Sequence, residues 1–136
     1  MNSRLVHTFI FATIVALGVS TTITALMMLA APQFFFDNIG TFAPFNRHYI
    51  GDLGAFTLPL GLGMLWAARN PMQHRLMILV AVGANLMHTG NHIYDDLLVG
   101  VFPSVQTVIL LVGSILLAVA LLAVKPQPKS VARAAA

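Results

Sequence analysis

The chain has 136 residues, of which 58% are hydrophobic and 8% are charged, and its formal net charge is +3. Soluble domains carry about 25% charged residues, so this composition excludes a water-soluble single domain. The absence of cysteine excludes disulfides, thiolate metal ligands and a cysteine nucleophile. The basic residues lie at the ends of apolar segments and not on one basic face, which argues against a nucleic-acid partner.

Four apolar segments are long enough to cross a hydrocarbon core of ~30 Å, which needs about 20 helical residues. We predict helices over about 5–31, 46–68, 74–98 and 103–124. Together they form a single all-α transmembrane domain over 1–124, an integral membrane four-helix bundle. The first helix is too long for the apolar region of a signal peptide, which has ~7–15 residues. The basic tail over 125–136 is predicted to be disordered and cytoplasmic.

The basic residues also predict an orientation. With a cytoplasmic N-terminus, only Arg47 lies outside, and six of the seven basic residues lie inside. The positive-inside rule therefore selects an arrangement with both termini in the cytoplasm, N-in and C-in. The basic residues on the inside are Arg4, Arg69, Arg75, Lys125, Lys129 and Arg133.

The connection over 32–46 is unusually aromatic, since it holds five of the nine phenylalanines. Such a segment does not expose its rings to water without a partner. We expect it to lie in the outer membrane interface, in contact with lipid. It could instead form a lid over the bundle mouth, or a docking surface, from Phe34 to Phe45, for a membrane protein partner.

Polar side chains gather at facing ends of the second and third predicted helices. His48 and Asp52 are four residues apart and share one face, while Asn85, His88, His92 and Asp95 form a stripe on the other helix. Consecutive helices run antiparallel, so the two stripes can face each other. At a rise of about 1.5 Å per residue, Asp52 and His92 lie at similar depth, and His88 lies one turn deeper, near Ala55 and Phe56.

Imidazole and carboxylate groups at this spacing suit a divalent transition metal such as zinc, iron, manganese or copper. The predicted ligands are His48, Asp52, His88, His92 and Asp95. Haem held by His48 and a histidine of the third helix is a second candidate cofactor. The same residues would also suit a site for proton transfer or a small ligand, or a structural polar network in a non-enzymatic accessory subunit of a larger membrane complex. The sequence does not decide whether the protein is an enzyme.

Two motifs carry a resemblance. The stretch from Asn46 to Pro71 opens with His-x-x-x-Asp-x-Gly and ends with Ala-Ala-Arg-Asn-Pro, and His88-x-x-x-His92-x-x-Asp95 follows it. This pattern resembles small bacterial four-helix membrane proteins, loosely grouped as DoxX-like or of unknown function. The resemblance covers about half of the chain and implies a four-helix bundle with a redox-linked or accessory role. The expected location is a bacterial cytoplasmic (inner) membrane, crossed several times.

Overall fold

The computed structural model describes residues 3–41 and 43–124, and this part of the chain is all-α, with five helices and no strand. The predicted tail over 125–136 lies outside the described residues. The four predicted long helices match α1, α3, α4 and α5 to within two residues at each end. The five helices are α1 (Ser3–Ala30), α2 (Pro32–Asn38), α3 (Arg47–Ala67), α4 (Arg75–Val99) and α5 (Val105–Ala123).

The prediction of a four-helix bundle is wrong, because a fifth helix, α2, forms in the aromatic connection. Ala31 leaves the helical conformation, with φ −138° and ψ 59°, and Pro32 then starts a new helix in the first-turn position that tolerates proline. Phe35 of α2 is buried against Met28 and Ile50, so α2 packs over the junction of α1 and α3. The connection is thus partly helical and anchored by one of its aromatic rings.

Three of the helices, α1, α3 and α5, are long and apolar enough to cross a membrane. Among the described residues, α4 falls short of that standard although it has 25 residues. The reason is its second half, which carries amide, imidazole and carboxylate side chains between Asn85 and Asp96. Among the described helices, α4 therefore carries the most amide, imidazole and carboxylate side chains.

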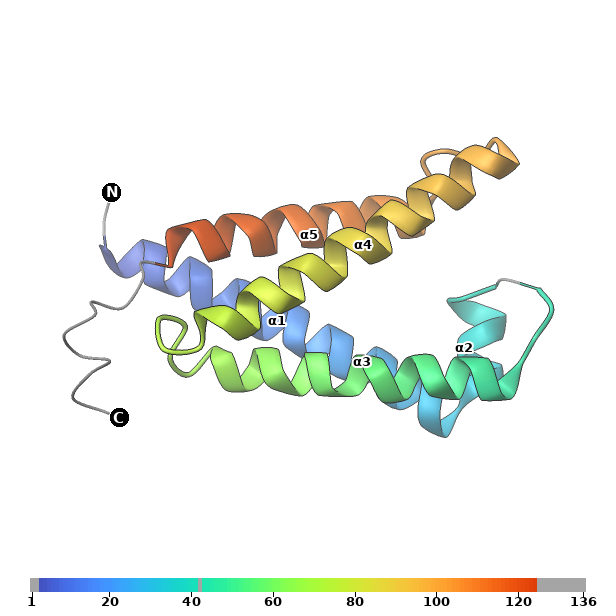
Figure 1. Cartoon of the computed structure of the whole chain (residues 1–136), viewed down its shortest axis with the longest axis horizontal. Helices are drawn as coiled ribbons and strands as arrows, with labels where there is room; N and C mark the ends of the chain where they lie inside the picture. The colour runs from blue at the N-terminus through green and yellow to red at the C-terminus, as the bar shows by residue number, and fades with distance from the viewer. Residues whose placement is uncertain (1–2, 42, 125–136) are drawn as a thin grey trace.

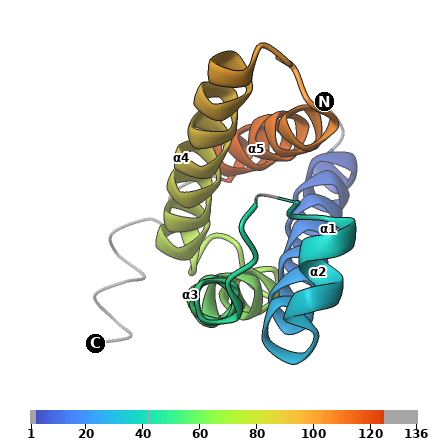
Figure 2. The same cartoon turned by 90° about the vertical axis from the view of Figure 1, so that its right-hand side faces the viewer.

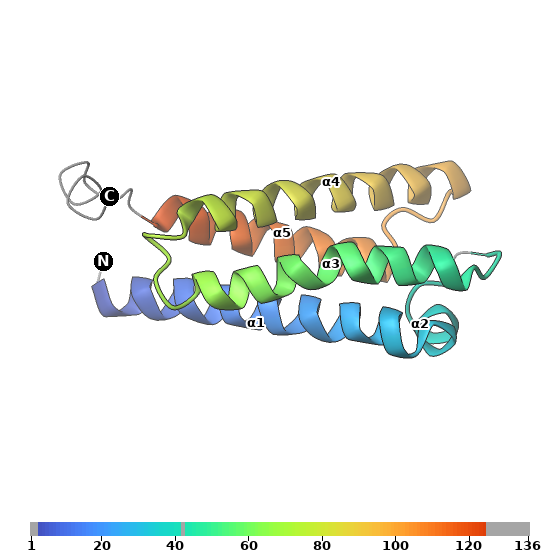
Figure 3. The same ribbon diagram turned by 60° about the horizontal axis from the view of Figure 1, so that its bottom comes forward.

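The long helices are arranged as two antiparallel pairs. α1 packs along α3, and α4 packs along α5 (Figures 1 and 3). Contacts between α3 and α4 are much less extensive than those within either pair. The start of α1 and the end of α5 lie at the same end of the molecule, shared with the connection from α3 to α4 (Figure 1). We call this the α3–α4 end.

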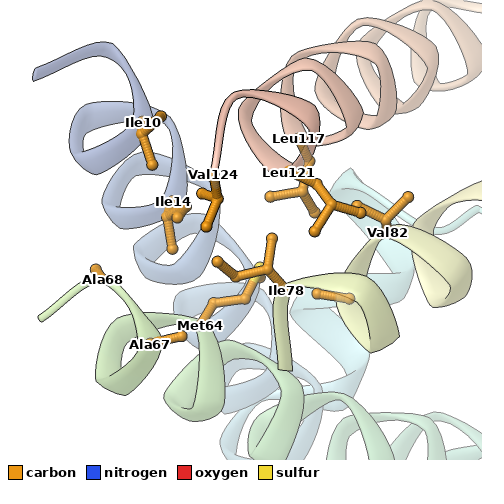
Figure 4. Packing of buried hydrophobic residues seen from close by; sticks show 11 residues of the cluster. Ile10, Ile14, Met64, Ala67, Ala68, Ile78, Val82, Leu117, Leu121 and Val124 are labelled. Carbon is orange, nitrogen blue, oxygen red and sulfur yellow. The ribbon is translucent and has the colours of Figure 1, made fainter. Parts of the chain in front are cut away.

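At the α3–α4 end, all four long helices meet in one apolar core (Figure 4). Two further contacts lie at the same end. The ring centroids of Trp66 and His74 are 4.0 Å apart, and Nε of Arg75 donates a hydrogen bond to the carbonyl of Val124 at 3.3 Å. The core residues are Ile10, Ile14, Met64, Ala67, Ala68, Ile78, Ala81, Val82, Leu117, Leu121 and Val124.

At the opposite end, the two helix pairs separate, and each is held by its own contacts (Figure 2). α4 and α5 are joined by a buried hydrogen bond of 3.0 Å between the hydroxyls of Thr89 and Ser114. α4 ends at Gly100, whose φ of 71° lies in the left-handed region that favours glycine. The ribbons of α3 and α4 diverge along the half of the molecule remote from the α3–α4 end (Figure 1), and we call this region of divergence the α3–α4 gap.

The surface of the helices is apolar. Leu122, Phe56 and Met87 are 81%, 80% and 78% exposed, and they belong to three different long helices. Water-soluble monomers rarely expose such extended apolar surface, whereas a helix surface in lipid is expected to do so. Together with the three apolar helices, this surface supports a membrane protein that contacts lipid.

Candidate functional site

The first predicted polar pair lies in the opening turns of α3. Asn46 caps this helix, since its Oδ1 accepts a hydrogen bond of 3.0 Å from the backbone N–H of Tyr49. Nε2 of His48 lies 3.4 Å from Oδ2 of Asp52, and the two side chains are 88% and 60% exposed. The pair is therefore on the outside of the helix, open to its surroundings.

The second predicted pair lies in the last turns of α4. The rings of His88 and His92 meet edge to face, with centroids 4.8 Å apart. On the next turn, Nδ2 of Asn91 donates to Oδ2 of Asp95 at 3.0 Å. Within the predicted stripe, His88 and His92 are therefore in contact, whereas Asp95 is paired with Asn91, which the stripe did not include.

The two pairs are not brought together. Within residues 3–41 and 43–124, no group of three or more histidine and acidic side chains is arranged to hold a metal ion. The physical reason is the helix pairing: α3 is held against α1 and α4 against α5, so the polar ends of α3 and α4 lie on opposite sides of the α3–α4 gap (Figures 1 and 2). Although α3 and α4 are consecutive and antiparallel, they are neighbours only at the α3–α4 end.

Asp96, next to the predicted ligand Asp95, is buried and has a structural role. Its Oδ2 accepts a hydrogen bond of 2.7 Å from the backbone N–H of Ser104, the residue that caps α5. This contact ties the end of α4 to the start of α5. Asp96 also borders a pocket of about 390 Å³, whose lining residues are Thr41, His92, Asp95, Asp96, Leu98, Val99, Val101, Ser104 and Gln106.

A second cavity, of about 370 Å³, lies between the two helix pairs and is lined by all four long helices. We call it the inter-pair cavity. His88 and Phe56 both line it, in agreement with the predicted similar depth of these two residues. Its polar lining residues are Ser20, Thr21, Thr24, Thr57, Asn85 and His88, and its other lining residues are Leu17, Met28, Leu53, Phe56, Leu60, Met64, Ala84, Ile109, Leu110 and Gly113.

The hydroxyl groups of this cavity differ from their neighbour Thr22. Oγ1 of Thr22 donates to the carbonyl of Gly18 at 2.7 Å, as is common for threonine within a helix. Among the described residues, the four hydroxyls that line the cavity make no hydrogen bond. Asn85 donates from Nδ2 to the carbonyl of Ala81 at 2.9 Å, and its side-chain oxygen accepts none from the described residues. The cavity wall therefore offers unused hydrogen-bonding capacity.

Reasoning from the sequence found His88 and Asn85 but missed the hydroxyls opposite them. Ser20, Thr21 and Thr24 lie within one turn of α1, and Thr57 lies on α3. Small hydroxyl residues in apolar helices also serve close packing, so none of them is distinctive alone. The signal that could have found them is the run of four hydroxyl residues over 20–24, in which Ser20 and Thr24 share a face.

Comparison of the chain with protein-family models, with curated proteins and with solved structures finds no match, so the resemblance to DoxX-like proteins stays a prediction.

Proposed function

We propose that the chain crosses a bacterial cytoplasmic membrane four times, with α4 as the fourth crossing and both termini inside. α4 has 25 residues, about 37 Å of helix, which is enough for a hydrocarbon core of ~30 Å. It runs antiparallel to α5 beside it, and α5 is apolar enough to span a membrane. The proposal is supported by the positions of Arg4, Arg69 and Arg75 at the α3–α4 end, with Arg47 at the other.

We further propose that the protein binds a small, largely apolar molecule in the inter-pair cavity. The observation that carries this proposal is a cavity wall with four hydroxyls, an amide oxygen and the imidazole of His88, inside helices whose outer surfaces are aliphatic. Ligand pockets have volumes of ~300–1,000 Å³ and apolar walls with a few polar groups, and the inter-pair cavity fits this description.

The competing explanation is that these polar groups fix the register of the helices. Groups with that role hydrogen-bond across helices, as Thr89 and Ser114 do. The cavity hydroxyls have no such partner among the described residues. None of these hydroxyl oxygens is a sealed, unpaired buried atom, so they stay accessible from the cavity, and a bound molecule that hydrogen-bonds to them is the better account.

Filling the cavity tests this proposal. Ala84 lines the cavity, and Ala84→Phe places a phenyl ring in it, whereas Ala55 is exposed on α3 and does not line it, so Ala55→Phe is the matched control. We expect native mass spectrometry to detect a bound small molecule on the wild type and on Ala55→Phe. Ala84→Phe should lower its occupancy about tenfold or more, the equivalent of ~1.4 kcal/mol. Equal occupancy in the two variants, or no bound molecule on the wild type, would contradict the proposal.

A divalent metal is the second candidate ligand. It is favoured by one observation: α3 and α4 each carry a pair of potential ligands four residues apart, His48 with Asp52 and His88 with His92. A histidine or carboxylate pair at this spacing can supply two ligands from one helix. Joining the two pairs, with Asp95, around one ion would require α3 and α4 to move together across the α3–α4 gap.

A further inference from the structure

The inter-pair cavity opens toward the lipid side of the molecule. Five of its lining residues are also exposed at the surface: Leu53 and Phe56 on α3, His88 on α4, Ser20 on α1 and Ile109 on α5. Three of the five lie on α3 and α4, the two helices whose ribbons diverge along the α3–α4 gap (Figures 1 and 2). The opening between α3 and α4, where most of the exposed lining lies, is flanked by apolar outer faces, so a molecule dissolved in the bilayer can reach the cavity there.

The described lining of the cavity contains no permanently charged side chain. Among its described lining residues there is no aspartate, glutamate, lysine or arginine, and His88 is the one titratable group. An ammonium group would find no acidic counterion in this wall, and a carboxylate would find only an imidazole that must first take up a proton, so burying either charge there is unfavourable. The wall thus selects against a permanently charged ligand.

The polar groups on the wall specify the head of the ligand instead. A hydroxyl both donates and accepts, and the side-chain oxygen of Asn85 accepts. A head group that is itself donor and acceptor, such as an alcohol, satisfies both kinds of partner. The remaining wall is aliphatic over α1, α3 and α5, at Leu17, Leu60 and Leu110, and suits a hydrocarbon tail.

We infer that the ligand of the inter-pair cavity is an uncharged amphiphile, with a hydroxyl-type head and a hydrocarbon tail, which enters from the bilayer between α3 and α4. This inference rests on the proposed binding function and adds the chemical class of the ligand and its route.

Three photoreactive probes with the same diazirine-bearing long-chain tail test the ligand class. One ends in a primary alcohol, one in a carboxylate and one in a trimethylammonium group, and each is added to the full-length protein in lipid nanodiscs. We expect the alcohol to label peptides of α3 and α4 that line the cavity, and to do so several-fold more than either charged probe. Peptide mapping by mass spectrometry gives the labelled positions.

A pair of isosteric variants separates binding from simple partition into lipid. Thr57→Val removes a cavity hydroxyl and keeps its shape, whereas Thr13→Val makes the same change on α1 outside the cavity. Loss of one hydrogen bond should lower labelling by the alcohol about threefold to tenfold in Thr57→Val and leave it unchanged in Thr13→Val. Equal labelling of the two variants would mean that the probe only samples lipid beside the protein, which overturns the inference.

The remaining outcomes tell the two proposals apart. If a charged probe labels the cavity as well as the alcohol does, and Thr57→Val weakens it, the cavity binds ligands but the class inferred here is wrong. If no probe labels the cavity and the wild type carries no bound molecule, the binding function itself fails. Labelling of the cavity by the alcohol alone supports both.

Discussion

Asp52 is the residue whose position most needs an explanation. It lies on α3, a helix apolar enough to cross a membrane, and its side chain is 60% exposed. An ionisable group at the bilayer centre costs ~2.5–3.5 kcal/mol, less toward the interface, and such groups usually have partners. His48 at 3.4 Å is one partner, and its own side chain is 88% exposed. A pair this open is either level with the lipid headgroups or completed by a ligand.

Replacing Asp52 by asparagine tests the metal candidate at this residue. The change keeps the shape and hydrogen bonding of the side chain and removes the charge that a cation requires. If a metal is bound, Asp52→Asn should lower its stoichiometry to near zero while the helical content stays unchanged. His88→Ala and His92→Ala should each have the same effect, and the double variant should be little worse than either, because ligands of one ion act as a unit. Metal analysis of the purified, reconstituted protein measures this.

Asp37→Asn is the matched control for that experiment. Asp37 is an exposed carboxylate on α2 that accepts a hydrogen bond of 2.9 Å from Nε2 of Gln33 and belongs to neither predicted pair. Its substitution should leave metal content unchanged. Full occupancy in Asp52→Asn would remove that residue from the ligand set. A wild type that binds no zinc, iron, manganese or copper would end the metal hypothesis.

Reasoning from the sequence finds candidate site residues that are rare in apolar helices and misses those that are common in them. The histidines and aspartates of α3 and α4 stand out because each is expensive in a membrane. Ser20, Thr21, Thr24 and Thr57 do not stand out, and only the structure shows that they share a cavity. The sequence also does not show that the carboxylate of Asp96 accepts a hydrogen bond from the backbone N–H of Ser104, whereas that of Asp95 does not.

Among the helices, α1 and α3 make the most extensive contact, and small residues allow it. A Cβ at Gly61 would lie 2.5 Å from Oγ1 and 2.7 Å from the backbone nitrogen of Thr22. A backbone atom cannot move aside as the end of a side chain can. Gly61 therefore lets α1 and α3 approach more closely than any other residue would, as small residues do in membrane helix pairs.

Gly61→Ala should consequently weaken the α1–α3 pair. The added methyl group forces the two helices apart, at a cost of about 1–3 kcal/mol in the free energy of unfolding. Gly83→Ala on α4 is the control, because a Cβ there meets nothing within 4 Å. Thermal unfolding in one detergent should give a lower midpoint for Gly61→Ala and an unchanged or higher midpoint for Gly83→Ala, because alanine is the better helix former by about 1 kcal/mol. Equal midpoints would show that the contact at Thr22 relaxes without cost.

The existence of the long helices could be predicted from the sequence, but their pairing could not. The apolar runs of α1, α3 and α5, and the more polar run of α4, predict the four long helices to within two residues at each end. α2 was missed because a short helix with three adjacent phenylalanines has the composition of an interfacial loop. The preference of α3 for α1 depends on close approach at positions such as Gly61, which hydropathy does not report. The polar ends of α3 and α4 are therefore further apart than their antiparallel order predicts.

The whole molecule is asymmetric along its long axis. The apolar core joins all four long helices at the α3–α4 end, whereas the inter-pair cavity and the polar rows of α3 and α4 lie toward the other end. The tightly packed end also carries Arg4, Arg69 and Arg75. If that end is cytoplasmic, then the polar groups and the α3–α4 gap open on the outer side of the membrane.

Reporter fusions test this orientation directly. Fusion at Gln73, between α3 and α4, should give an active cytoplasmic reporter and an inactive external one, and fusion at Asp37 on α2 should give the reverse. The physical reason is that positively charged connections are retained on the cytoplasmic side, and the connection from α3 to α4 is flanked by Arg69 and Arg75. Arg69→Glu with Arg75→Glu removes that bias and should produce a mixed population, whereas Arg47→Glu should leave the orientation unchanged. An active external reporter at Gln73 in the wild type would reverse the orientation and place the polar rows of α3 and α4 on the cytoplasmic side.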